Sequence, residues 1–174
     1  IIVEDVALEL KGTEGIIRND IPEAEIIGTA QNESEYWRLL RKEEPQLVLL
    51  DLGLGGSTTI GVEICRQTKQ TRPNVKVLIF TGEILNEKLW VDVLDAGADG
   101  IILKTGELLT RRDVVAVMSG KHLVVNQPIL ERIVNRFKHT VGSEMMMQDA
   151  KIRYEIDEYD ERFLRHLALG YNKE

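Results

Sequence analysis

The sequence predicts an α/β fold in which one parallel sheet of five strands is covered by helices on both faces, a doubly wound arrangement. Short apolar runs alternate with helix-period segments through about the first 120 residues. Three runs are apolar throughout their centres, as strands covered on both faces should be: Leu47–Leu50, Val77–Phe80 and Ile101–Leu103. Ligands of such sheets bind at the carboxyl ends of the strands.

Strands and helices are expected in alternation. The expected strands are Ile1–Val3, Glu25–Gly28, Gln46–Leu50, Val75–Thr81 and Gly100–Lys104. The expected helices are Leu8–Asp20, Glu33–Glu43, Ile60–Gln70, Glu87–Ala96 and Thr110–Ser119. Residues that stop helices follow each of them: Pro22, Pro45, Gly97, Gly120 and Pro73.

The pattern changes after Gly120. Residues 122–156 are expected to form an extended piece, one helix with Pro128 near its first turn, and a weakly periodic linker. Residues 157–169 are expected to form a short amphipathic helix that cannot be stable alone in water. The chain starts at Ile1 rather than methionine, so we expect it to begin inside a longer protein and to stop within a second domain.

Composition narrows the function classes. The chain is 43% hydrophobic and 29% charged, which is ordinary for a globular protein, and no apolar run approaches the ~20 residues of a membrane span. The net charge of −7 gives no support for nucleic-acid binding by these residues. The single Cys65 excludes an internal disulfide. We therefore expect a cytoplasmic protein without a membrane partner.

One stretch, "LVLLDLGLGGSTTIG", runs from a buried strand directly into Asp51 and then into glycine, serine and threonine. A buried charge costs several kcal/mol unless it is paired or reaches water, so the strand must open onto a polar pocket. The other strands end in Glu4-Asp5, Thr81 and Lys104. Because carboxyl ends of parallel strands share one edge, these side chains can converge there.

Such a cluster has a definite chemistry. Three neighbouring carboxylates repel one another, and Mg²⁺ is a natural counter-charge. A lysine and a hydroxyl facing them suit a trianionic group such as a phosphoryl group. Asp51 at the centre then becomes the attacking carboxylate, and an aspartyl phosphate the product. The glycines after Asp51 carry no side chains, so the loop leaves room for a donor to approach the carboxylate.

The motifs "IIVED", "LVLLDLGLGG", "VLIFTGE" and "AGADGIILK" occur in the order and spacing of the receiver domain of two-component response regulators, which the sequence resembles. The tail resembles the NarL/FixJ type, whose output is a LuxR-like helix-turn-helix. The resemblance implies a flavodoxin-like receiver at 1–121, a linker at 122–156 and the beginning of a truncated DNA-binding domain at 157–174. It places no DNA-contacting residue in this chain, since the recognition helix would lie beyond residue 174.

The resemblance also implies roles for individual residues. Glu4, Asp5 and Asp51 would hold Mg²⁺, with Asp51 as phosphoryl acceptor. Thr81 and Lys104 would contact the phosphoryl group, and Ile101 would stand at the switch position. Gly53, Gly82 and Glu83 would lie near the phosphoryl group. The implied partners are a sensor histidine kinase or small phosphodonor, DNA through the output domain, and a second copy of the chain as one form of assembly.

Three positions depart from the family pattern. Ile101 stands where Tyr or Phe is usual, and isoleucine has less area to gain or lose by switching. The loop "GLGGSTTIG" lacks the usual proline and has about two additional residues, which predicts a longer and looser loop. Thr105 follows Lys104 where many receivers have a cis-proline, so the geometry of that bond stays open.

Three function classes therefore compete. The leading one is a phosphorylation-controlled transcription regulator, which catalyses only its own phosphoryl transfer and dephosphorylation. The second is a receiver that acts as a protein-interaction module without phosphorylation, which Ile101 and the altered loop favour. The third, a Mg²⁺-dependent phosphohydrolase, needs an acidic residue two positions after Asp51, where the chain has Gly53.

Overall fold

A computed structural model describes residues 1–82, 87–104, 109–120 and 123–125. The chain divides into two units, Ile1–Asn126 and Gln127–Glu174, and the described residues all belong to the first. Four expectations lie outside the described residues: the linker helix, the start of a helix-turn-helix, the position of Glu83 and the geometry of the bond before Thr105. No helix in the described part of the chain is long and apolar enough to cross a membrane.

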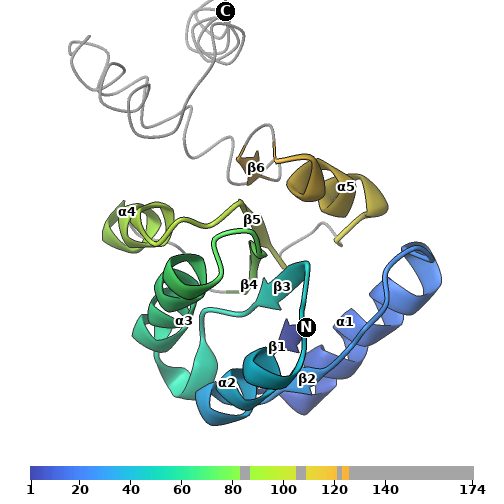
Figure 1. Ribbon diagram of the computed structural model, residues 1–174, viewed down its shortest axis with the longest axis horizontal. Coiled ribbons are helices and arrows are strands. Elements are labelled where there is room, and N and C mark those ends of the chain that lie inside the picture. The colour runs from blue at the N-terminus through green and yellow to red at the C-terminus, as the bar shows by residue number, and fades with distance from the viewer. Residues whose placement is uncertain (83–86, 105–108, 121–122, 126–174) are drawn as a thin grey trace, which may run out of the picture. The chain divides into compact units, whose positions relative to one another are not determined.

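The central sheet is parallel throughout, in the order β2-β1-β3-β4-β5-β6 (Figure 1). Its strands are β1 (Ile2–Val3), β2 (Thr29–Ala30), β3 (Leu47–Leu50), β4 (Lys76–Thr81), β5 (Gly100–Leu103) and β6 (Val124–Val125). The doubly wound fold class is confirmed. The predicted strand count of five was too low for the described residues, because the extended piece after Gly120 pairs with β5 as a sixth strand.

The second strand was predicted at Glu25–Gly28 but forms at Thr29–Ala30. The predicted stretch still touches its neighbour, since the Ile2 amide donates to the Gly28 carbonyl at 3.1 Å. Its apolar residues are used for packing, because Ile26 lies against the hydrophobic core. The strand-like apolar pattern of residues 25–28 therefore reflects burial, while the pairing of β2 with β1 begins at Thr29.

Within the part of the chain that the structure describes, five helices alternate with the first strands, as predicted. They are α1 (Ala7–Asp20), α2 (Glu33–Lys42), α3 (Thr58–Thr71), α4 (Glu87–Asp95) and α5 (Arg111–Ser119). Helices α1 and α5 lie on one side of the sheet, and α2, α3 and α4 lie on the other (Figure 1). The caps fit the sequence: Asn32 accepts from the Glu35 amide at 3.0 Å, and Thr110 forms a reciprocal capping box with Asp113.

The core is split by the sheet into two layers. The layer under α1 and α5 contains alternate strand residues with the buried faces of these helices: Ile2, Leu49, Leu78, Phe80, Ile102, Leu10, Ile17, Val114 and Val117. Because successive strand residues face opposite sides, Val48, Leu50, Val77, Ile79 and Ile101 belong to the other layer, and all five are buried. On that side a buried hydrogen bond of 2.7 Å between Tyr36 and Thr68 ties α2 to α3.

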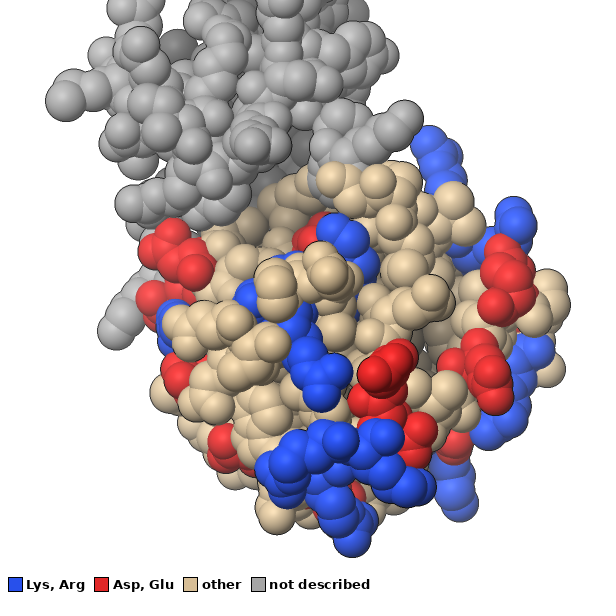
Figure 2. Space-filling view, viewed as in Figure 1, with Lys and Arg blue, Asp and Glu red and all other residues tan. Residues whose placement is uncertain are grey.

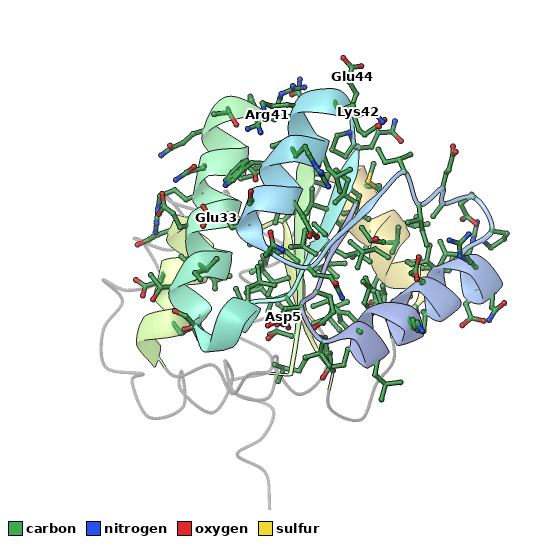
Figure 3. All side chains as sticks on the ribbon, turned by 90° about the horizontal axis from the view of Figure 1, so that it is seen from below. Asp5, Glu33, Arg41, Lys42 and Glu44 are labelled. Carbon is green, nitrogen blue, oxygen red and sulfur yellow. The ribbon has the colours of Figure 1, made fainter. Side chains whose placement is uncertain are left out.

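Charged side chains lie at both ends of the domain. Asp5 lies at one end, and Arg41, Lys42 and Glu44, at and just after the end of α2, lie at the other (Figure 3). Figure 2 shows Lys and Arg side chains gathered at the lower edge of the domain in that view, next to Asp and Glu side chains.

Candidate functional site

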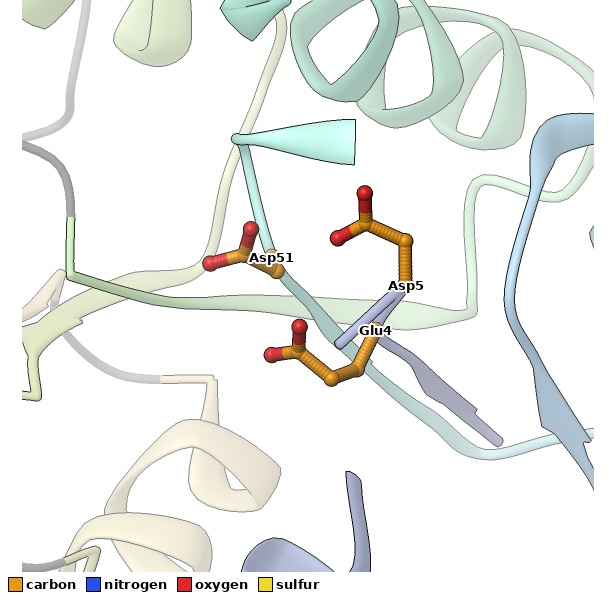
Figure 4. Close-up of side chains that lie close together, drawn as sticks. All are labelled: Glu4, Asp5 and Asp51. Atoms are coloured by element: carbon orange, nitrogen blue, oxygen red, sulfur yellow. The ribbon is translucent and has the colours of Figure 1, made fainter. Parts of the chain in front are cut away.

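Two strand ends bring three carboxylates together. Glu4 and Asp5 follow β1, and Asp51 follows β3. Backbone hydrogen bonds of 2.9 Å continue the ladder one residue further, from the Glu4 amide to Ala30 and from the Asp51 amide to Val3. One ligand oxygen from each carboxylate lies within 4.8 Å of the others (Figure 4). Glu4 is only 2% exposed and Asp51 8%, so the cluster is a partly desolvated site rather than a surface group.

The loop after β3 is built around these carboxylates. The Gly53 amide donates to Asp51 Oδ2 at 2.7 Å, and the Gly55 amide donates to Asp5 Oδ2 at 2.8 Å. Leu54–Gly56 form a short 3₁₀ turn, and Leu54 is buried. Gly55 has φ of 61°, in the left-handed region that favours glycine. Two amides of the loop therefore donate to acidic side chains of the site, contacts that the sequence did not predict.

Lys104 joins the cluster from the end of β5. Its Nζ contacts three carboxylates: Glu4 most closely, Glu9 at 2.6 Å and Asp51 Oδ1 at 3.2 Å. It also lies 5.6 Å from the centre of the Phe80 ring, a cation–π distance. Burial would lower the pKa of Lys104, but its hydrogen bonds to Glu4 and Glu9 and the charge of Asp51 outweigh burial and raise the pKa above its usual value. The lysine is therefore charged throughout the physiological range.

Glu4 is the most buried acid of the site. Burial raises its pKa above the ordinary value, opposed by the hydrogen bond from Lys104 and by the Val6 amide, which donates to Glu4 Oε1 at 3.0 Å. The neighbouring charge of Asp51 adds to the increase. A cation placed here relieves that repulsion.

Four of the five residues expected to converge at the strand ends thus meet: Glu4, Asp5, Asp51 and Lys104. Gly53 touches Asp51 through its amide, as its expected position requires. Thr81 stands at the end of β4, fully buried, and its carbonyl accepts from the Lys104 amide at 2.8 Å.

Gly82 and Ile101 occupy different surroundings. Gly82 is exposed, and a Cβ built there would meet nothing within 4 Å. Ile101 pairs in register with Ile79 of β4 and is fully buried. In the described state its side chain is already inside the core.

Sequence reasoning missed Glu9. It lies in the first turn of α1, where an acidic residue also favours the helix dipole, so the sequence offered a sufficient structural reason for it. Its place in the first turn was the available signal, because α1 begins only two residues after Asp5 and that turn therefore lies near the strand end. The contact with Lys104 spans 95 residues of sequence, and no local pattern reveals it.

The donor set fits a hard divalent cation. Mg²⁺ takes oxygen ligands and commonly uses one or two carboxylates together with water. Glu4, Asp5 and Asp51 offer three carboxylate oxygens with the spacing given above. Among the residues that the structure describes, no sulfur or imidazole takes part in this cluster, which is the pattern of a magnesium site rather than a zinc site.

Comparison with known families agrees with this geometry. Residues 1–114 match the family described as response regulator receiver domain. Residues 124–174 match a second family, described as a family of unknown function (DUF5932). The second match lies almost entirely beyond the described residues.

Similar proteins carry regulatory names. The chain is 25% identical over 136 residues to the transcriptional regulatory protein LiaR of Bacillus subtilis, covering 78% of this chain and 63% of the relative. It is 28% identical over 150 residues to the response regulator protein VraR of Staphylococcus aureus, covering 86% of this chain and 66% of the relative. The chain therefore spans just under two thirds of the length of these relatives.

Solved structures give the same fold. A LuxR-family two-component response regulator from Aurantimonas sp. SI85-9A1 superposes with a TM-score of 0.68 at 25% identity, covering 78% of this chain and 94% of that one. A receiver domain from Methanospirillum hungatei JF-1 superposes with a TM-score of 0.56 at 27% identity, covering 69% and 89%.

Proposed function

Because the chain belongs to the response regulator receiver domain family, we propose that it is a phosphorylation-controlled regulator that accepts a phosphoryl group on Asp51. One observation supports this most: Lys104 Nζ stands 3.2 Å from Asp51 Oδ1, at the edge where Glu4 and Asp5 gather beside Asp51. A nucleophilic carboxylate, a cation for the incoming charge and acidic ligands for a metal are the parts that phosphoryl transfer needs.

The proposed transfer is a displacement at phosphorus. An Asp51 carboxylate oxygen forms a bond to phosphorus while the bond to the donor's leaving group breaks, and the leaving group departs with its electron pair. The Gly53 amide holds Oδ2 of Asp51, which orients the carboxylate. Lys104 stabilises the oxygens of the phosphoryl group, and the Thr81 hydroxyl is proposed as a second contact. When bound by Glu4, Asp5 and Asp51, Mg²⁺ would neutralise developing charge on these oxygens.

The proposed phosphodonor is a sensor histidine kinase or a small phosphodonor such as acetyl phosphate. Two similar proteins are named as a transcriptional regulatory protein and a response regulator, which supports control of transcription as the output. DNA contact is proposed for a part of the protein outside this chain, since the described residues form the receiver unit and the chain has a net charge of −7.

A second candidate is a receiver that binds a partner protein without being phosphorylated. The observation that favours it is Ile101: it is fully buried at the position where the family expects a switching aromatic ring. The intact set of acidic residues and Lys104 favours the phosphorylated regulator, so the interaction module is the lesser candidate.

Intact-mass measurement tests the proposal. Incubation with Mg²⁺ and acetyl phosphate should add one phosphoryl group to the wild type and none to Asp51→Asn. Asp20→Asn is the matched control, because Asp20 is an exposed aspartate at the end of α1, away from the strand ends, and should label as the wild type does. Labelling that persists in Asp51→Asn contradicts the assignment. A wild type that never labels, with either donor class, supports the interaction module instead.

A further inference from the structure

We propose that Glu9 is a positioning residue that competes with the phosphoryl group for Lys104. This inference rests on the proposed function, because it concerns the same lysine. The Glu9 Oε2 atom lies 2.6 Å from Lys104 Nζ, closer than the 3.2 Å between that ammonium and Asp51 Oδ1. In the described state, Lys104 Nζ therefore lies closer to Glu9 than to the carboxylate it is proposed to serve.

The hydrogen-bonding capacity of the lysine makes this a competition. An ammonium group has three N–H donors and accepts nothing. Three carboxylates contact Lys104 Nζ: Glu4, Glu9 and Asp51. A phosphoryl oxygen on Asp51 can receive a donor from Lys104 only if one of these contacts is released.

The surroundings decide which contact yields. The side chain of Glu4 is 3% exposed and also accepts a hydrogen bond from the Val6 amide, so burial and this second bond keep it in place. Asp51 carries the phosphoryl group itself. The side chain of Glu9 is 48% exposed, so its carboxylate can rotate away from Lys104 and be solvated by water. Glu9 is therefore the partner that Lys104 exchanges for the phosphoryl group.

The consequence is a resting bias against phosphorylation. Any phosphoryl-like anion that binds at Asp51 must first break a partly exposed ion pair. Such pairs are weak, so the effect is modest, a threefold to fivefold change in affinity, or about 0.6–1 kcal/mol at 1.4 kcal/mol per tenfold. This gives Glu9 a role in setting sensitivity to the phosphodonor without making it part of the acceptor itself.

Calorimetric titration with beryllofluoride (BeF₃⁻) in saturating Mg²⁺ measures the competition. Glu9→Gln keeps the shape and removes the charge, and Glu9→Asp keeps the charge but is one carbon too short to reach Lys104. Glu14→Gln is the matched control, because it neutralises an acid of the same helix that pairs with Arg18. Mg²⁺ affinity without the anion is the second readout.

Competition for Lys104 predicts that Glu9→Gln and Glu9→Asp both bind BeF₃⁻ threefold to fivefold more tightly, with Mg²⁺ affinity within twofold of wild type and Glu14→Gln unchanged. If only the Gln variant binds more tightly, Glu9 acts through its charge at a distance and the proposal is wrong. If the wild type binds BeF₃⁻ and neither variant differs from it, the competition fails while the proposed function stands. If the wild type binds no BeF₃⁻ at all, the proposed function fails and the competition with it.

Discussion

A methyl group added to Gly61 should distort the loop that carries Asp51. Gly61 is buried in α3, and an ideal Cβ there would lie 2.7 Å from Leu52 Cα, 2.9 Å from the Leu52 carbonyl oxygen and 3.0 Å from the Asp51 carbonyl oxygen. All three are backbone atoms, so no side-chain rotation can make room. Either α3 or the loop after β3 must shift.

The magnitude follows from comparison with a second helical glycine. Gly12 lies inside α1, and a Cβ there meets nothing within 4 Å. Gly12→Ala should therefore stabilise the protein by about 0.5–1 kcal/mol, the ordinary helix-propensity gain. Gly61→Ala has the same gain but also an overpacking cost of about 1–3 kcal/mol. The difference in unfolding free energy between the two variants should thus equal the clash alone, about 1–3 kcal/mol.

Urea denaturation of the wild type and the two variants gives that difference directly. The same samples can be labelled with acetyl phosphate, and Gly61→Ala should label more slowly because the Asp51 carbonyl is pushed. Equal shifts of the two urea midpoints in the same direction would refute the reasoning, since they would show that α3 accommodates a Cβ without cost.

Three further predictions concern the metal, the switch position and the buried thiol. Asp5→Asn should weaken Mg²⁺ binding in a calorimetric titration yet raise the thermal midpoint, because it removes like-charge repulsion; unchanged Mg²⁺ affinity would contradict the ligand assignment. Phosphorylation should change the self-association constant of the full-length protein by less than about tenfold, or 1.4 kcal/mol. The ratio between the phosphorylated and resting forms should be nearly the same in Ile101→Ala. If sedimentation shows a hundredfold change that is lost in the variant, Ile101 is the switch. Burial raises the pKa of Cys65 from 9.0 to about 12, so the folded thiol should resist a thiol reagent at pH 8. The free energy of unfolding should fall as the pH rises from about 9 toward 12, because only the unfolded thiol ionises freely in that range. Rapid labelling of the folded protein would count against this.

The sequence predicted the architecture well where burial on both faces leaves a plain signal. The all-apolar centres of β3, β4 and β5 and the glycine and proline stops fixed these elements within one or two residues. The second strand was misplaced because its neighbours are apolar for a different reason: Ile26 packs on the core without joining the ladder. Periodicity reports burial, and only hydrogen bonding distinguishes a buried extended segment from a strand.

The site was predictable to the extent that topology brings strand ends to one edge. Glu4, Asp5, Asp51 and Lys104 each follow a strand, so their convergence required only the assumption of a parallel sheet. The hydrogen bonds between the β3–α3 loop and the acidic side chains were not predictable, because one of them joins the Gly55 amide to Asp5, 50 residues away in the sequence. Glu9 was hidden for the same reason: its partner is on a different strand, and its position in a first turn already had a local explanation.

Charge explains why these features belong together. Four carboxylates and one ammonium gather at this edge, a formal sum of −3 from −4 and +1. The carboxylates are Glu4, Asp5, Glu9 and Asp51, and all but Asp5 contact Lys104. Backbone amides reduce the repulsion only in part, by donating to three of the acids, and burial still raises the pKa of Glu4. Such an excess of negative charge destabilises the fold through like-charge repulsion, and the proposed Mg²⁺ would offset that repulsion. A phosphoryl group would add further negative charge, which Lys104 can meet only by leaving a carboxylate. Among the acids that contact Lys104, Glu9 has the most exposed side chain. Lys104 therefore breaks its contact with Glu9, because water can then solvate the Glu9 carboxylate.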